Sequence, residues 1–270
     1  MKKSKKFHFC IPPEECGKKE NFMSDNFSAK EIVICLPTYN ERENLRQTAA
    51  AILTAVPRVS ILIIDDNSPD GTGCIADQMA CEDRRISVLH RARKQGLGRA
   101  YLDGFRTVLK QPDVRLIGQM DADLSHPPDR LPAMIHAAEF SDLVIGSRYV
   151  PGGGTRNWNF YRKFISRFGS LYARTWLGMP VRDLTGGFKI WRRSLLETVL
   201  EHPVNAGGYV FQVETSFLAF RLGARITELP ILFTDRNVGK SKMTADIALE
   251  AFWRLPAMRV RKVRKVRSEN

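Results

Sequence analysis

Two carboxylates separated by one residue are the feature of the sequence that points most directly to chemistry. Asp121 and Asp123 follow residues 114–120, which we expect to form a strand. An Asp-x-Asp pair at such a strand end places both carboxylates on one side of a tight turn, where hard oxygen ligands suit a divalent cation. The pair therefore predicts a Mg²⁺ or Mn²⁺ site. The alternative is a pair of turn or helix-capping aspartates.

Two apolar runs also end in polar residues. The run 32–36 leads into Tyr39 and Glu41, and the run 61–64 leads into Asp66. In an open parallel sheet, ligands bind beyond the carboxyl ends of the strands. We therefore expect these side chains to converge with the Asp-x-Asp pair on one edge of a sheet.

Apolar strands alternate with helical patterns along the chain. We expect strands at 32–36, 61–64, 85–89, 114–120 and 142–146, and helices at 41–56, after the turn 68–71, and at 96–109. This alternation predicts βαβ units with right-handed crossovers, and so an α/β fold with a mostly parallel sheet.

The composition limits the class of protein. The chain has 270 residues, 43% of them hydrophobic and 26% charged, as in an ordinary globular protein of one or at most two domains. Lys and Arg exceed Asp and Glu by 42 to 29, and the net charge of +13 predicts an anionic partner: nucleic acid, an acidic membrane surface or a phosphorylated substrate. The sequence holds no apolar run long enough to span a bilayer, so we expect any membrane association to be peripheral.

The cysteines bear on the cellular compartment. The chain has five, an odd number, and no CxxC pair; they are Cys10, Cys16, Cys35, Cys74 and Cys81. We interpret them as reduced thiols of a cytosolic protein, not as a disulfide or zinc framework.

A series of motifs resembles the inverting family-2 glycosyltransferases. Residues 33–44 (VICLPTYNEREN) resemble the opening of that family, and residues 64–72 (IDDNSPDGT) its second strand end. Residues 121–128 (DADLSHPP) resemble the metal loop of the polyprenyl-phosphate mannosyltransferases, the dolichol-phosphate mannose synthase group. Further matches follow in the same order at 148–149, 184–188 and 235–242. The resemblance implies a GT-A fold with a mostly parallel central sheet flanked by helices, in a catalytic subunit without transmembrane helices.

The resemblance also implies roles on the donor side. The positions implied to bind the donor GDP-mannose are Pro37, Tyr39, Glu41, Ile64, Asp66, Asp121, Ala122, Asp123, Arg148, Arg236 and Lys242. Tyr39 offers a ring face to a purine, although simple packing would also explain it. Glu41 and Asp66 offer acceptors to ribose hydroxyls and base N–H groups, and Glu41 is also compatible with a helix N-terminus. Asp121 and Asp123 match metal positions, and we add the Ser125 hydroxyl to that set.

An ionised acceptor removes the need for a general base. A phosphate monoester is largely ionised at neutral pH, so it needs positioning and charge compensation rather than deprotonation. The resemblance implies that Arg148, Arg162 and Ser166 bind the acceptor phosphate, and we assign the catalytic roles to Asp123 and Arg148. The expected reaction transfers mannose from GDP-mannose to a polyprenyl (dolichyl-type) monophosphate with inversion. A different donor, such as UDP-glucose, remains an alternative.

Two segments suggest contact with an anionic membrane surface. Between 158 and 176, aromatic and basic residues interleave at helical spacing, which suits a helix lying in a bilayer interface or a helix facing the core. The segment 252–267 carries aromatic residues followed by a basic run, which binds lipid alone or meets a small membrane subunit. We expect a flexible extension at 1–30, the catalytic domain at 31–250 and a basic amphipathic tail at 251–270. Together these features place the protein at the cytoplasmic face of a membrane.

Nucleic-acid binding is the competing hypothesis from another class. It would account for the net charge, but no helix-turn-helix, zinc or RRM pattern is recognisable. Carboxylates at three strand ends would also repel phosphates unless a cation intervened. We therefore expect no nucleic-acid partner.

Overall fold

The molecule is built around a seven-stranded sheet. The computed structural model describes residues 31–158, 160–204, 208–234 and 258–259. The sheet has the order β3-β2-β1-β4-β7-β5-β8. Its strands are β1 (Ile32–Thr38), β2 (Ser60–Asp65), β3 (Ile86–His90), β4 (Leu116–Gln119), β5 (Leu143–Ser147), β7 (Lys189–Arg192) and β8 (Ile226–Pro230). Only β7 runs antiparallel to its neighbours, which confirms the prediction of a mostly parallel sheet.

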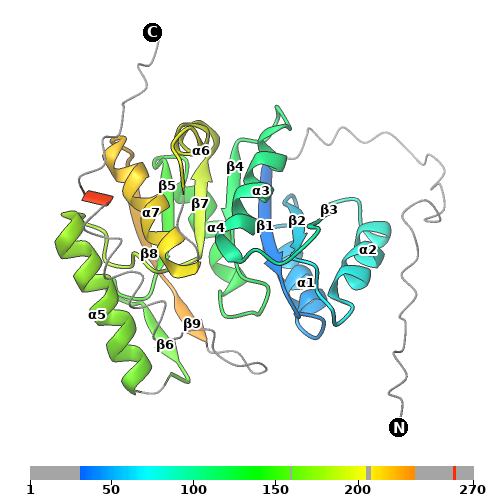
Figure 1. The fold of residues 1–270 in the computed structure, drawn as a ribbon, viewed down its shortest axis with the longest axis horizontal. Helices are drawn as coiled ribbons and strands as arrows, with labels where there is room; N and C mark the ends of the chain where they lie inside the picture. The colour runs from blue at the N-terminus through cyan, green and yellow to red at the C-terminus, as the bar shows by residue number, and fades with distance from the viewer. Residues whose placement is uncertain (1–30, 159, 205–207, 235–257, 260–270) are drawn as a thin grey trace.

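Helices cover both faces of this sheet (Figure 1). One face carries α1 (Leu45–Ala55), α2 (Thr72–Glu82) and α4 (Leu131–Ala137), the last preceded by the 3₁₀ turn η2 (Pro128–Arg130). The other face carries α3 (Leu97–Leu109), α6 (Arg193–Leu200) and α7 (Gly208–Arg221). Helix α5 (Phe160–Leu177) lies at the end of the molecule that β8 occupies, near a small parallel pair of strands, β6 (Gly154–Arg156) and β9 (Leu232–Thr234).

The continuous apolar runs of the sequence are explained by burial on both faces. In β1, Val33 and Cys35 pack among the residues of α3 and α7, whereas Ile34 and Leu36 pack among those of α1 and α4. Successive side chains of a strand point to opposite faces, so a strand covered on both sides needs apolar residues at every position. Strand β7 was not predicted; its four residues give too short a pattern to separate from the adjoining helix.

The polar strand ends meet at one edge, as expected. The parallel register of β1 and β2 sets Thr38 beside Asp65, so Tyr39 and Asp66 leave the sheet at the same level. On the other side of β1, the Met120 N–H donates to the Cys35 carbonyl at 3.3 Å, and Asp121 follows directly. The polar residues that follow β1, β2 and β4 therefore lie at one edge of the sheet, as the sequence predicted.

The start of α1 differs from the prediction. The helix expected from residue 41 begins at Leu45, because residues 41–44 form a turn. In that turn the Glu41 carbonyl accepts the N–H groups of Asn44 and Leu45 at 3.0 and 2.9 Å. Glu41 thus lies one turn before the helix, with its side chain buried against the strand ends.

The cysteine interpretation is wrong for two residues. Cys74 and Cys81, both in α2, are each disulfide-bonded. Seven residues of helix advance by about 10 Å, beyond the reach of one disulfide, so they are not bonded to each other. Cys35 is a buried free thiol, as expected, and Cys10 and Cys16 lie outside the described residues. An odd cysteine count leaves room for pairs between distant segments, and the cysteines no longer support a reducing compartment.

The two ends of the chain are described only in part. The extension predicted for 1–30 lies outside the described residues, as does all of the tail except Met258 and Arg259. Met258 is buried among residues of the α3–α7 face, and Arg259 donates to the Trp176 carbonyl at 3.0 Å. Within the described ranges, no helix has the length and apolarity needed to cross a membrane.

Candidate active site

A tight turn after β4 carries the Asp-x-Asp pair. The backbone N–H and the hydroxyl of Ser125 both donate to one Asp123 carboxylate oxygen, at 3.0 and 2.5 Å. Between them, Leu124 adopts a left-handed conformation with φ of 60°. A bulky residue in this region costs of order 1 kcal/mol or more, and such costs are found where a functional loop must hold an unusual shape. The turn therefore fixes Asp123 in one orientation.

Asp121 is positioned by two residues that the sequence analysis did not assign to the site. The buried ring of His126 accepts the Asp121 N–H at Nδ1, at 3.1 Å, and stacks on Phe188. Burial lowers the pKa of His126, so the ring is neutral at physiological pH. From α3, the Tyr101 hydroxyl donates to the Met120 carbonyl at 3.0 Å and lies 3.4 Å from Asp121 Oδ1.

The donor set at this turn fits a hard divalent cation. Asp121 and Asp123 supply carboxylate oxygens and Ser125 a hydroxyl oxygen. Within the described ranges, no group of three or more His, Cys, Asp or Glu residues forms a closed metal cage. A site with two protein carboxylates, completed by water and substrate phosphate oxygens, is the arrangement that Mg²⁺ and Mn²⁺ adopt with nucleotides.

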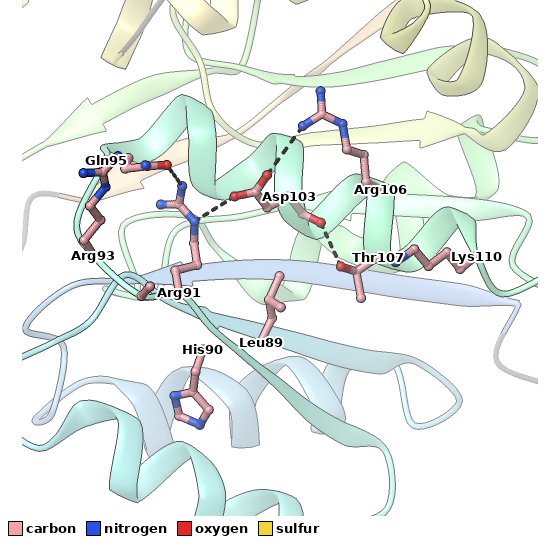
Figure 2. Close-up of a pocket in the computed structure, with 10 residues that line it drawn as sticks. Leu89, His90, Arg91, Arg93, Gln95, Asp103, Arg106, Thr107 and Lys110 are labelled. Atoms are coloured by element: carbon pink, nitrogen blue, oxygen red, sulfur yellow. Dashed lines mark hydrogen bonds and ion pairs between the residues drawn. The ribbon is translucent and has the colours of Figure 1, made fainter.

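Asp66 holds the loop that follows β3. Its carboxylate pairs with Arg91 and accepts the Gly96 N–H at 3.1 Å and the Gln95 N–H at 3.3 Å. Figure 2 shows the Arg91 side chain reaching toward Gln95 and Asp103, which it contacts at 2.7 and 2.9 Å. Much of the hydrogen-bonding capacity of Asp66 is therefore used to fix this loop.

A cavity lies between the same loop and helix α3. It has a volume of about 430 Å³, and the residues drawn in Figure 2 line it. Arg106 donates to Asp103 at 3.5 Å on its wall, and Arg93 and Lys110 are exposed around it. The cavity is basic, and neither Asp121 nor Asp123 is among the residues that line it.

The surroundings of Tyr39 include a cation close to its ring and a buried carboxylate two residues further along the chain. The Lys94 amino group, carried by the loop that Asp66 holds, lies 3.6 Å from the centre of the Tyr39 ring. Glu41 is buried, and one of its carboxylate oxygens accepts the Asn44 amide at 3.0 Å. A half-buried ring with an adjacent cation is a suitable platform for an aromatic base.

Three of the expected donor positions are buried in the protein interior. Pro37 and Ile64 lie within β1 and β2, and the Ile64 side chain packs in the core. The Ala122 side chain is also buried, and its carbonyl accepts the Thr48 hydroxyl at 2.9 Å. These residues shape the backbone of the site; their side chains are not presented to a ligand.

Arg148 is locked in place by a buried carboxylate. Its Nε and Nη2 each lie 2.7 Å from an oxygen of Asp183, and Nη2 also donates to the Thr185 hydroxyl at 2.8 Å. Asp183 is fully buried, and although burial alone would raise its pKa, the charge and hydrogen bonds of Arg148 hold it below its usual value. The pair is thus ionised. Asp183 was missed because nothing in the sequence relates it to a residue 35 positions away.

Aromatic rings surround the Arg148 guanidinium. Its central carbon lies 5.2 Å from the ring centre of Tyr149 and 5.5 Å from those of Trp158 and Phe233. Rings at this distance stabilise a cation and exclude water from it. Arg148 is therefore a fixed positive charge in a partly dry setting.

A second pocket opens beside Arg148. It has a volume of about 340 Å³, and its basic residues are Arg148, Lys163 and Arg167. Lys163 and Arg167 are one helical turn apart on α5, so they lie on the same face. Ser166 is buried and accepts the Tyr149 hydroxyl at 2.7 Å, which ties α5 to the segment after β5.

Three expected site residues cannot be placed. Arg162 belongs to α5, but its side chain lies outside the described residues, as do Arg236 and Lys242 altogether. Their roles stay predictions. The basic residues that the structure brings to the pocket, Lys163 and Arg167, were noted in the sequence only as part of an amphipathic pattern.

Helix α5 also presents a row of apolar side chains to solvent. Phe164, Phe168 and Leu171 are 59%, 59% and 58% exposed, and Trp176 is 42% exposed. The spacing of Phe164, Phe168 and Leu171 places these three along one stripe of the helix. Because the ring-bearing side faces out, the alternative that these rings pack into the core is wrong for Phe164 and Phe168.

The fold and the edge described above define a class of enzyme. The family model for glycosyl transferase family 2 matches residues 33–200, and the chain belongs to this family. It is a glycosyltransferase with the mixed α/β architecture of the GT-A group, as expected.

Particular relatives can then be named. The chain is 46% identical over 220 residues to an undecaprenyl-phosphate mannosyltransferase from Micrococcus luteus, covering 82% of this chain and 90% of the relative. It is 42% identical over 234 residues to a polyprenol monophosphomannose synthase from Mycolicibacterium smegmatis, covering 86% and 88%. Among solved structures, a glucosyl-3-phosphoglycerate synthase from Mycobacterium tuberculosis, crystallised with Mn²⁺, UDP and phosphoglyceric acid, shares the fold: its TM-score is 0.62 at 18% identity, covering 86% and 79% of the two chains.

Proposed function

We propose that this glycosyltransferase moves mannose from GDP-mannose to a polyprenyl monophosphate, with inversion at the anomeric carbon. The observation that carries the proposal is the pocket lined by Arg148, which follows β5, and by Lys163 and Arg167 of α5, a helix that also exposes an apolar stripe. A phosphate on a lipid chain needs both features side by side. The names of the two curated relatives support the sugar and the class of acceptor.

The donor lies along the strand-end edge. Tyr39 offers its ring to the base, and Asp66 and Arg91 form the wall beside it. Asp121 and Asp123 hold Mg²⁺ or Mn²⁺, with Ser125 orienting Asp123 through its hydroxyl. The bound cation supplies charge neutralisation for the departing diphosphate. Mn²⁺ in the related fold supports a metal of this kind.

No protein base is required for the attack. The acceptor phosphate is already ionised, so its oxygen is nucleophilic as soon as it is held in line with the anomeric carbon. Lys163 and Arg167 compensate its charge, and Arg148, kept rigid by Asp183, sets its orientation. Arg162 and Ser166 belong to the same face of α5 in this proposal, and Arg236 and Lys242 close on the diphosphate.

Membrane contact brings the acceptor to the pocket. Phe164, Phe168 and Leu171 enter the headgroup region of a bilayer, while Lys163 and Arg167 attract anionic lipids. The protein then works as a peripheral enzyme at the cytoplasmic membrane face, by itself or with a small membrane subunit. A lipid phosphate reaches Arg148 without leaving the interface.

The deciding experiment compares donors on one acceptor. Purified protein is incubated with labelled GDP-mannose, UDP-glucose or UDP-GlcNAc, together with undecaprenyl phosphate and Mg²⁺ or Mn²⁺, and the lipid product is extracted into organic solvent. We expect label in the lipid only with GDP-mannose. Transfer from UDP-glucose alone would reassign the donor, and no transfer from any of the three would overturn the proposal.

A further inference from the structure

A chain of buried side-chain hydrogen bonds runs under the active site. The Trp191 indole N–H donates to Gln119 Oε1 at 3.3 Å, and Gln119 Nε2 donates to Gln212 Oε1 at 2.6 Å. An indole N–H can only donate, so it fixes which end of Gln119 faces it, and Gln119 in turn fixes Gln212. The Gln212 amide nitrogen must therefore point away from Gln119.

That nitrogen is a buried donor without an acceptor. Gln212 is 1% exposed, and its Nε2 has no hydrogen-bond partner among the described residues. Leaving a buried donor unsatisfied costs about 1–3 kcal/mol, so a protein rarely keeps one without a reason. A ligand group that accepts this hydrogen bond would recover the cost.

The unpaired amide nitrogen of Gln212 points to the active-site side of the structure. A Cβ added to Gly187 would lie 3.5 Å from Gln212 Nε2, 3.7 Å from Asp121 Oδ1 and 3.4 Å from His126 Cε1. Glycine leaves this space open where any other residue would fill it. The space has a hydrogen-bond donor on one side and a carboxylate acceptor on the other.

We propose that Gln212 binds a hydroxyl group of the transferred hexose in the space above Gly187. A hydroxyl can accept from the Gln212 amide while it donates to Asp121. Gln212 Nε2 is buried in the structure, so the hydroxyl would reach it from the Gly187 side. This inference rests on the proposed transfer of a hexose and assigns one of its specificity contacts.

The surroundings of Gln212 hold it ready for this role. The buried Lys189 amino group donates to the backbone carbonyl of Gln212 at 2.9 Å and to the Ser216 hydroxyl at 2.9 Å. These two bonds fix this stretch of α7. Gln119 lies two residues before Asp121 in the chain, so the same network links α7 to the Asp-x-Asp turn. The amide is thereby preorganised.

Gln212→Glu is the sharpest variant. It keeps an oxygen for Gln119, replaces the outward donor by an acceptor and adds a negative charge. We expect kcat/KM for GDP-mannose to fall about tenfold to a hundredfold, while the Kd for GDP, which has no hexose, stays within about twofold by calorimetry. Gln78→Glu, the same substitution at an exposed glutamine of α2, is the matched control and keeps near wild-type values. Equal losses for GDP and GDP-mannose would overturn the inference.

Deoxy donors then identify the hydroxyl. The donors to compare are GDP-mannose analogues that lack the 2-, 3-, 4- or 6-hydroxyl. For one of them, the kcat/KM of the wild-type enzyme should fall about as much as Gln212→Glu lowers it for intact GDP-mannose. With that same analogue, the kcat/KM of the variant should fall no further. Losses that multiply at all four positions contradict the contact. Gly187→Ala serves as a second variant if Gln212→Glu does not fold, since its methyl meets only ordinary contacts; it should raise KM for GDP-mannose but not Kd for GDP. Wild-type turnover of intact GDP-mannose tests the proposed function separately.

Discussion

The Arg148 guanidinium and the Asp183 carboxylate face each other with two parallel hydrogen bonds of 2.7 Å, in a setting where Asp183 is fully buried. A third bond joins the Arg148 backbone N–H to the same carboxylate at 2.9 Å. This geometry fixes both the side chain and the strand end that carries it. Because the Arg148 side chain is already ordered, it loses little conformational entropy when it orients an anion.

Replacing Asp183 should separate stability from acceptor binding. Asp183→Ala leaves a buried arginine without its counter-ion, which typically costs about 3–5 kcal/mol of unfolding free energy. Asp183→Asn keeps the shape and should fold better, but it should raise KM for the polyprenyl phosphate more than Kd for GDP. Urea unfolding and steady-state kinetics test this; a variant with unchanged acceptor KM would show that the pair is structural only.

The Arg148–Asp183 pair also predicts that the unfolding free energy depends on pH in the acid range. Arg148 holds the folded-state pKa of Asp183 below its ordinary value of 3.8. The stabilisation is therefore complete above the unfolded pKa and is lost as the pH falls through the lower, folded value. The difference in unfolding free energy between wild type and Asp183→Asn should be constant at neutral pH and shrink below about pH 4. A constant difference down to the acid transition would contradict the ion pair.

Lys189 predicts that the unfolding free energy depends on pH in the alkaline range, because burial disfavours the charged form of its amine. Burial lowers the pKa of this amine from 10.5 to about 7. Between these values the unfolded chain binds a proton that the folded protein does not, so the unfolding free energy rises with pH, by up to about 1.4 kcal/mol per pH unit. Lys189→Met removes this contribution. Urea unfolding at pH 7.5, 8.5 and 9.5 should give a wild-type minus variant difference that grows with pH; parallel curves would refute the buried neutral amine.

The sequence predicted the parts of this molecule that depend on local pattern. The alternation around Val33 and Ile34 follows from burial on both faces, and the rule that ligands bind at strand ends brought Tyr39, Asp66 and Asp121 to one edge. Glu41 was placed at that edge too, although its helix begins later than predicted.

The partners of these residues could not be predicted in the same way. Asp183, His126 and Gln212 act through contacts between distant or irregular segments, and no periodicity marks such pairs. Lys163 and Arg167 were visible in the sequence, but which side of α5 faces the site depends on how Ser166 meets Tyr149. Tertiary packing decides these features, and a single sequence does not encode it in a readable pattern.

The Asp-x-Asp turn should bind Mn²⁺ only when nucleotide is present. Asp123→Ala removes one of two carboxylates, and we expect at least a hundredfold lower turnover, since a metal and its ligands supply several kcal/mol of charge stabilisation. Asp123→Ala should also bind Mn²⁺ more weakly, which is measured by electron paramagnetic resonance when Mn²⁺ is titrated into the protein with GDP. Asp129→Ala, an exposed carboxylate in η2, is the control. Wild-type Mn²⁺ affinity in Asp123→Ala would remove this residue from the metal site.

The pocket on α5 should matter for the acceptor alone. Lys163→Ala and Arg167→Ala each remove a cation beside Arg148, and losing a charged hydrogen bond to phosphate costs about 1.5–3 kcal/mol. We therefore expect KM for undecaprenyl phosphate to rise about tenfold or more, with KM for GDP-mannose unchanged. Arg174→Ala, exposed further along the same helix, should leave both constants as they are. If the donor KM rises instead, the pocket belongs to the diphosphate.

The apolar stripe of α5 should determine vesicle binding. Phe164 and Phe168 are stacked on each other at a ring distance of 6.2 Å and are both largely exposed. Inserting each ring into a bilayer interface is worth roughly 1.5–3 kcal/mol, so replacing both by Ser should lower the partition coefficient on phosphatidylglycerol vesicles at least tenfold. Phe140→Ser removes an equally exposed ring, 67% accessible, from the loop after α4 and is the matched control. Flotation assays at low and high salt separate the ring contribution from that of Lys163 and Arg167, because only the charged part weakens with salt. Equal binding by both variants would mean that another surface contacts the membrane.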